Sequence, residues 1–148
     1  MNYEAYPFSR NEQNNSFQFQ STGKRGTFEK AIAFSLITDN IYNLALLDFN
    51  PLMQDYTDDS ITDNGDMPEI MATVMAVAID YLNDFPDRRI YLTGNTASRT
   101  RLYQIAISKV LKSISQYVTV LGYYNDLWIP FEPNMNFEGF LVTKNFID

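Results

Sequence analysis

The sequence predicts an α+β fold in which an antiparallel-rich sheet carries two helices packed on one face. Segments of period-two alternation predict strands, and two segments with apolar residues at helical spacing predict helices. Their order, which we summarise as β-β-β-α-β-α-β-β, lacks the strict alternation of a parallel α/β protein. A chain of 148 residues fits one domain, so we expect residues 1–148 to form a single domain with a loosely ordered segment over residues 1–16.

The first half of the chain is predicted to form a meander of strands. Residues 17–20 alternate between Phe and Gln, and two glycines then mark a turn at residues 21–26. Residues 28–36 alternate again, with Lys30 on the same face as the apolar side chains. Asp39 and Asn40 tolerate the positive φ of a tight hairpin, which leads into a strand over residues 41–49.

Helix signals dominate the middle of the chain. Asp66 is a suitable N-cap and Pro68 suits the first turn of a helix whose wide apolar face extends to residue 82. Residues 89–93 form a short strand, and Thr96 or Ser98 caps a second helix. We expect this helix to bury one side, with apolar residues at the spacing of Leu102, Ile105, Ala106, Val110 and Ile114. Further strand-like segments follow at residues 117–121, 127–132 and 139–143.

Composition excludes several kinds of chemistry. The chain has no cysteine and no histidine, which excludes thiol nucleophiles, Ser–His–Asp arrangements and thiolate or imidazole metal sites. A metal would need oxygen ligands alone. The acidic loop at residues 55–66 does not fit the spacing of a calcium loop, because Gly65 at its sixth position would put Met71 at the twelfth. We therefore expect no catalytic residue, metal or cofactor, and regard an enzyme as the less favoured class.

The net charge of −7 argues against broad attraction to nucleic acid or anionic lipid. Residues 1–6 lack the pattern of a signal peptide, and no apolar run approaches the roughly 20 residues that span a bilayer. We expect an acidic cytoplasmic protein that does not bind membranes.

Charge is segregated along the chain. Residues 51–87 hold nine acidic side chains and no Lys or Arg, whereas residues 88–125 hold six basic side chains and no Asp or Glu. Either the two tracts pair within the molecule, or the basic tract is an exposed anion site.

The junction at Gly94–Tyr103 lies at the centre of the basic tract. A strand, a glycine turn and a hydroxyl-capped helix point free N–H groups at one spot, where the helix end favours anions. Arg99 and Arg101 add guanidinium groups suited to phosphate or carboxylate, so Thr96, Ser98, Arg99 and Arg101 form a candidate anion site. The spacing matches neither a dinucleotide-binding nor a P-loop motif. The structural alternative is that the arginines hold the acidic loop at residues 58–66.

Aromatic residues are concentrated in residues 117–140, which contain Tyr123, Tyr124, Trp128, Phe131 and Phe137. Aromatic side chains on a sheet can stack nucleic-acid bases. This region has no Lys or Arg before Lys144, so a core or dimer-interface role is favoured.

Two stretches resemble the signatures of a family of small uncharacterised bacterial proteins of the Bacteroidetes type. They are Asn64-Gly65-Asp66-Met67 followed by Met71-Ala72-Thr73-Val74, and the run Gly-Asn-Thr-Ala-Ser-Arg-Thr-Arg-Leu-Tyr from Gly94 to Tyr103. Asn95 stands where that family has Ser. The resemblance implies a shared α+β fold and transfers no catalytic residue.

Two functions from different classes follow. The first is a non-enzymatic interaction protein that acts through a protein partner or as a homo-oligomer, with a homodimer as the simplest form. The alternative is an anion-, phosphate- or nucleic-acid-binding protein centred on the Gly94–Tyr103 junction, for which the nucleic-acid signal is weak.

Overall fold

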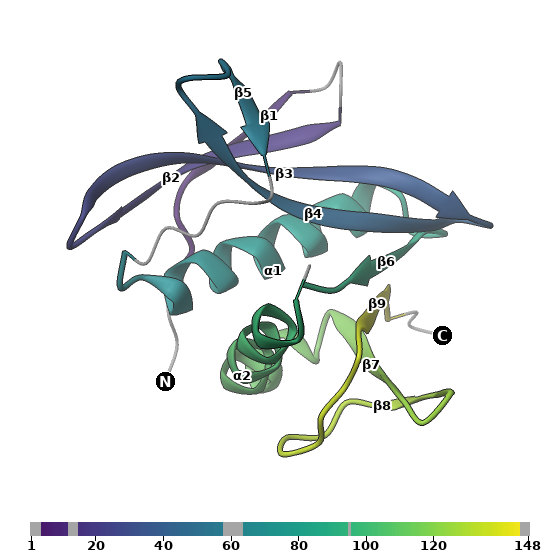
Figure 1. Cartoon of the computed structure of the whole chain (residues 1–148). Helices are drawn as coiled ribbons and strands as arrows, with labels where there is room; N and C mark the ends of the chain where they lie inside the picture. Colours follow the sequence, from purple (N-terminus) through teal and green to yellow (C-terminus); the bar gives the residue numbers. More distant parts are fainter. Residues whose placement is uncertain (1–3, 12–14, 58–63, 95, 146–148) are drawn as a thin grey trace.

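One continuous sheet organises the molecule (Figure 1). The computed structural model describes residues 4–11, 15–57, 64–94 and 96–145. Over these residues the strands follow the order β1-β2-β3-β4-β6-β9-β7-β8, and β5 pairs with β4 off this path. All pairs are antiparallel except β4 with β6, which confirms the predicted antiparallel-rich α+β class.

The N-terminal half is a meander of β1 (Phe8–Asn11), β2 (Ser16–Gly23), β3 (Gly26–Thr38), β4 (Ile41–Asn50) and β5 (Asp55–Thr57). The β3–β4 hairpin turns at Asp39 and Asn40 with φ of 38° and 65°, as their side chains predict. The start of β4 pairs with β6, whereas its end pairs with β5. A single long strand therefore joins the two parts of the sheet.

The second half contains α1 (Met67–Asp84), β6 (Arg89–Leu92) and α2 (Ala97–Ile114), followed by β7 (Val118–Tyr124), β8 (Leu127–Pro130) and β9 (Phe140–Lys144). The summary order counted two strands after the second helix, but each of the three strand-like segments predicted there forms a strand. The structure also adds β5 and, within the N-terminal segment expected to be loosely ordered, β1. Both are short strands that pair at an edge, and strands of three or four residues carry almost no periodicity.

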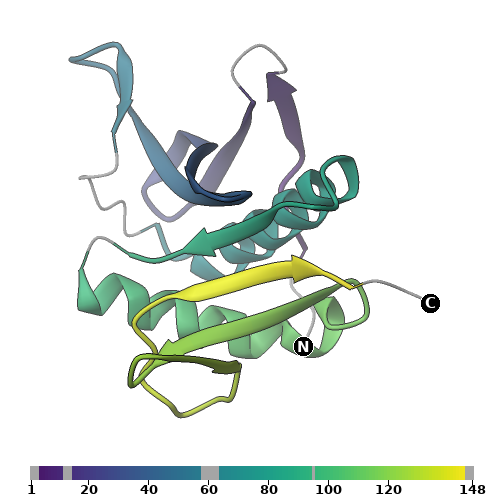
Figure 2. The ribbon, with the colours of Figure 1, turned by 90° about the vertical axis from the view of Figure 1, so that its right-hand side faces the viewer.

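Both helices pack on one face of the curved sheet, as predicted (Figure 2). Inward-facing residues of β2, β3, β4, β6, β7 and β9 form one hydrophobic cluster with α1 and α2. The largest fully buried side chains include Phe17, Ile32, Leu44, Met71, Tyr81, Ile90, Ile107 and Phe140.

The prediction for the buried side of α2 was wrong in part. Ala106, Val110 and Ile114 are buried as expected, together with Tyr103 and Ile107. Leu102 and Ile105 instead face outward, with 45% and 46% of their surfaces exposed. The apolar residues of α2 thus occupy two sides of the helix, and only one of these sides meets the sheet.

Asp66 occupies the predicted N-cap position of α1, but its side chain makes no capping hydrogen bond. Its buried carboxylate instead accepts from the hydroxyls of Tyr6, at 2.6 Å, and Ser21, at 2.5 Å. Asn64 donates to the Ser21 hydroxyl and to the carbonyl of Gly26. This buried network ties the start of α1 to the β2–β3 hairpin and to the segment before β1.

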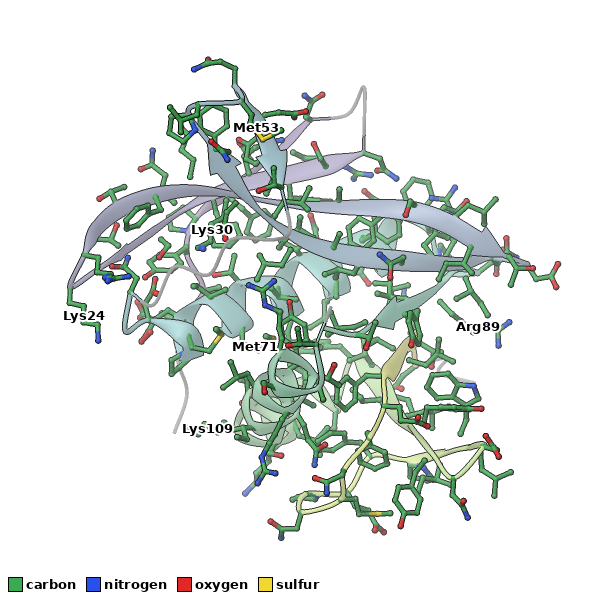
Figure 3. The ribbon with its side chains drawn as sticks, viewed as in Figure 1. Lys24, Lys30, Met53, Met71, Arg89 and Lys109 are labelled. Atoms are coloured by element: carbon green, nitrogen blue, oxygen red, sulfur yellow. The ribbon has the colours of Figure 1, made fainter. Side chains whose placement is uncertain are left out.

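Lys30 is buried on the inner face of β3, with only 4% of its surface exposed (Figure 3). It forms an ion pair with Asp48, which lies directly opposite on β4. Burial removes hydration from both charges, so each depends on the other for compensation. The period-two pattern placed Lys30 on the apolar face correctly, and Asp48 explains how a lysine can lie there.

We expect Lys30→Met to lower the free energy of unfolding by about 3–5 kcal/mol, because it leaves the Asp48 carboxylate buried without its cation. The double variant Lys30→Met/Asp48→Leu should be more stable than Lys30→Met alone. Urea unfolding of the wild type, the two single variants and the double variant provides this measurement. Strictly additive losses in the double variant would contradict the pairing.

A pH dependence follows from Tyr6. Burial and the hydrogen bond to Asp66 raise the pKa of Tyr6 to about 12 from its usual 10.0. The unfolded chain therefore loses this proton first, and the stability that the group contributes is present below pH 10 and is lost as the pH rises towards 12. Tyr6→Phe should flatten the decline of the unfolding free energy between pH 10 and 12, as measured by urea unfolding at fixed pH. Tyr117→Phe, at a half-exposed tyrosine, is the matched control and should leave the decline unchanged.

Candidate functional site

The junction between β6 and α2 is a tight turn that only glycine fits. A Cβ on Gly94 would lie 2.6 Å from the backbone nitrogen of Thr100, closer than side chains approach backbone. Thr96 has extended backbone and its side chain accepts the N–H of Arg99 at 3.1 Å, so it is Thr96, and not Ser98, that caps α2. The predicted strand–turn–helix junction is confirmed.

Threonine hydroxyls hold this turn in place. The hydroxyl of Thr100 accepts the N–H of Gly94 at 3.0 Å and lies 3.1 Å from the carbonyl of Thr96. The hydroxyl of Thr93 donates to the carbonyl of Glu138 at 3.0 Å, which connects the turn to the segment before β9. The hydroxyls of Thr93, just before the motif, and of Thr96 and Thr100 within it are therefore structural.

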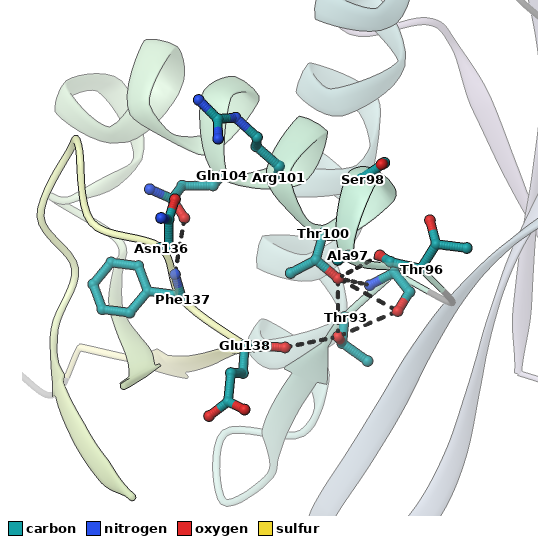
Figure 4. A pocket seen from close by; sticks show the side chains of 11 residues that line it. Thr93, Thr96, Ala97, Ser98, Thr100, Arg101, Gln104, Asn136, Phe137 and Glu138 are labelled. Atoms are coloured by element: carbon teal, nitrogen blue, oxygen red, sulfur yellow. Dashed lines mark hydrogen bonds between the residues drawn. The ribbon is translucent and has the colours of Figure 1, made fainter. Parts of the chain in front are cut away.

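An open hollow of ≈ 700 Å³ lies against this turn, and we call it the junction groove (Figure 4). Its walls are the start of α2 and the segment at residues 136–138. The buried amide of Gln104 joins these walls, because it donates to the carbonyl of Met135 and accepts the N–H of Phe137 at 3.1 Å. The residues that line the groove are Thr93, Gly94, Thr96, Ala97, Ser98, Thr100, Arg101, Gln104, Asn136, Phe137 and Glu138.

The structure separates the four predicted anion-site residues. Thr96, Ser98 and Arg101 line the junction groove and are exposed. Arg99 is partly buried and lines a second hollow of ≈ 170 Å³, on the side of the turn that faces β4 and Tyr103. Residues two positions apart in a helix are about 200° apart around its axis. Arg99 and Arg101 therefore cannot converge on one ligand from the helix alone.

The junction groove carries charges of both signs. The N-terminus of α2 contributes the positive end of a helix dipole, and Arg101 lies one turn further along. Glu138 lines the opposite wall (Figure 4). The helix end and Arg101 on the first wall would attract a simple anion, whereas the carboxylate of Glu138 on the second wall would repel it.

The contacts of the basic tract bear on the two alternatives, which are pairing with the acidic tract and an exposed anion site, but they decide between them only in part. Arg88 lies over the rings of Tyr42, at 4.3 Å, and Phe85, at 3.8 Å, and donates to the Tyr81 hydroxyl at 2.7 Å. Its charge is thus used in packing. Asp84 of the acidic tract pairs with Arg10, which belongs to neither tract. Asp66 accepts from the hydroxyls of Tyr6 and Ser21, and residues 58–63 of the acidic loop lie outside the described residues.

A further hollow, which is apolar and which the sequence did not predict, lies on the outer side of the two helices. One part of it, ≈ 180 Å³, is lined by Met67, Pro68, Leu102, Ile105, Ala106, Lys109 and Val110. The other part, ≈ 290 Å³, is lined by Ala5, Ala72, Met75, Ala76, Ile79, Val110, Ser113, Ile114 and Tyr117. Val110 lines both parts, so the two hollows adjoin between α1 and α2, and we call them together the helix groove.

The signal for the helix groove was present in the sequence. Ala72, Ala76 and Ile79 follow the i, i+4, i+7 spacing of one helix face, and no Lys or Arg lies anywhere in α1. The wide apolar face of α1 was assigned to the sheet alone. In the structure Ala72, Ala76 and Ile79 are partly exposed and line one part of the groove together with Val110, Ser113 and Ile114.

The aromatic residues of the C-terminal region divide into core and surface. Phe131, Phe137 and Phe140 pack together in the core, as predicted. Trp128 is 41% exposed and contacts the rings of Tyr91 and Tyr123.

These features place the chain in a structural class: it is a small α+β protein with one curved sheet, two helices on the inner face of that sheet, and a polar and an apolar groove at α2. The chain belongs to the family described as "Family of unknown function (DUF6934)", which it matches over residues 2–145. The comparisons with curated proteins and with solved structures each found no match. Among the described residues, no helix has the length and apolar character needed to cross a bilayer.

Proposed function

We propose that this protein is a non-enzymatic interaction protein whose contact surface is the helix groove, and that it acts through a protein partner or through self-association. The observation that carries the proposal is the apolar outer edge of α1, where Ala72, Ala76 and Ile79 stand at positions that charged residues occupy on an ordinary surface helix. A surface helix normally carries polar residues on the side away from the core, so small apolar residues there indicate an edge that another element covers.

Support also comes from α2. Leu102 and Ile105 expose almost half of their surfaces beside the groove, whereas Tyr103, Ile107 and Val110 of the same helix are buried. Contiguous apolar surface rimmed by charged residues is typical of protein contact sites. Exposed Lys109 forms part of such a rim on α2 (Figure 3).

Site-specific photocrosslinking in the native host tests this proposal. With p-benzoylphenylalanine in place of Ile105, we expect irradiation to give a discrete crosslinked product, because the side chain would lie inside the contact. The same replacement of Leu127, which is 63% exposed on β8, is the matched control and should give none. If position 105 gives no discrete product, or if both positions react alike, the helix groove is not the contact surface.

We propose anion binding in the junction groove as a second candidate function. Its support is the convergence of Ser98, the first turn of α2 and the exposed guanidinium of Arg101 on one hollow of ≈ 700 Å³. Phosphate groups, either inorganic or in a nucleic-acid backbone, suit these donors. Glu138 limits the affinity by its like charge.

We expect Arg101→Ala to weaken the binding of inorganic phosphate or a single-stranded oligonucleotide at least threefold, and to lower the salt slope for the oligonucleotide by about one. Isothermal titration at several salt concentrations measures both. Arg89→Ala removes an exposed arginine from the opposite end of β6 and is the matched control. Equal effects of the two variants would show a diffuse charge effect and no site.

The setting of this function is also a proposal. The resemblance of the Asn64–Val74 and Gly94–Tyr103 stretches to bacterial proteins, and the cysteine-free acidic composition, support action in a bacterial cytoplasm.

A further inference from the structure

We propose that the N-terminal strands bind a neutral carbohydrate on the face of the sheet that is turned away from the two helices. A hollow of ≈ 800 Å³ lies there between β1, β2, β3 and β5, and we call it the sheet trough. Its polar lining residues include Ser9, Gln18, Gln20, Thr22, Glu29 and Tyr56. The inference goes beyond the proposed function, because neither the helix groove nor the junction groove shares a lining residue with this hollow.

Strand alternation places the polar side chains on one face. Phe19 of β2 belongs to the hydrophobic cluster with the helices, so Gln18 and Gln20 on either side of it point the opposite way. Glu29 of β3 lies directly opposite Gln20, and Ser9 of β1 lies directly opposite Gln18. These four polar side chains therefore stand side by side on the outer face of the sheet.

The curvature of the sheet makes this outer face concave. Figure 2 shows β1 and the β4–β5 hairpin rising on either side of β2 and β3, away from α1. Ala31, which lies opposite Gln18, exposes only 3% of its surface although it is on the outer face. Tyr56 projects from the β5 wall, where its ring contacts Phe49 at a centroid distance of 5.3 Å. Residues from both ends of this row of strands therefore line one hollow.

The lining groups select a neutral ligand that has many hydroxyls. The amides of Gln18 and Gln20 and the hydroxyls of Ser9 and Tyr56 can both donate and accept hydrogen bonds, and the Glu29 carboxylate accepts them. Among the described residues that line the trough, none is Lys or Arg, so an anionic ligand would meet no cation. A cationic ligand would leave the amide and hydroxyl donors without acceptors. Sugar hydroxyls match donors and acceptors alike.

The polar groups of the trough are available to a ligand. Within the described part of the chain, the side chains of Ser9, Gln20 and Glu29 make no hydrogen bond, and all three are exposed. Burial and the charge of Glu29 raise the pKa of Tyr56, so its hydroxyl stays protonated and can donate. The ring of Tyr56 offers an apolar surface to the C–H groups of a pyranose ring. The volume also lies within the roughly 300–1,000 Å³ of small-molecule sites.

NMR titration of the isotope-labelled full chain tests the inference, with maltotriose, cellotriose, lactose and N,N′-diacetylchitobiose as probes. We expect at least one of these sugars to shift the amide signals of Gln18, Gln20 and Glu29 and to leave those of Leu102 and Ile105 in place. The inference is overturned if none of the sugars shifts the trough signals. It is also overturned if arginine amide shifts them and the sugars do not, because the trough would then be a cation site.

Substitutions locate the binding. We expect Gln20→Ala and Glu29→Gln each to raise the Kd of the bound sugar at least threefold, because each removes hydrogen bonds to its hydroxyls. Gln116→Ala, at an exposed glutamine after α2, is the matched control and should leave the Kd unchanged. Equal Kd values in all variants would place the sugar elsewhere and overturn the inference. Circular dichroism confirms that each variant is folded, and crosslinking at position 105 reports on the proposed function independently.

Discussion

The arrangement of the sheet, of α2 and of the N-terminal segment depends on the burial of the apolar residues of α1. Nine of its eighteen residues are buried, and at about 100° per residue they extend around just over half of its circumference. A flat sheet covers only one side of a helix, so α1 requires additional cover. The curved sheet provides the first part, α2 the second, and the segment before β1 the third, where the N–H of Tyr6 donates to the buried hydroxyl of Thr73 at 2.8 Å. The helix groove is the part that stays open between α1, α2 and this segment.

Much of the architecture could be predicted from local chemistry. The β3–β4 turn at Asp39 and Asn40, the cap at Thr96 and the glycine at position 94 each follow from what one residue does to its own backbone. These features need no knowledge of distant parts of the chain, so the order of the long elements emerged correctly.

Features that depend on distant partners could not be predicted in the same way. The Asp66 side chain was expected to cap α1, but Tyr6 and Ser21 lie close enough to take its carboxylate instead. Leu102 and Ile105 were placed in the core because their spacing suits a buried face, yet the sheet meets the side that holds Tyr103 and Ile107. Two apolar stripes on one helix give the same signal as one wide stripe, and only the position of the sheet distinguishes them.

The same limit applies to the candidate site. The motif at residues 94–103 suggested a cluster of anion-binding groups because hydroxyls and arginines are close together in sequence. In the fold, Gly94, Thr96 and Thr100 bind one another, and Gln104 joins α2 to residues 135–137. The side chains of Thr93, Thr96, Thr100 and Gln104 are therefore occupied in holding β6, α2 and the segment before β9 together. Ser98 and Arg101 are the exposed side chains of this turn that line the junction groove, whereas Leu102, Ile105 and Lys109 line the helix groove. The distribution of unsatisfied surface on α2 thus favours contact with a protein over chemistry on a small molecule.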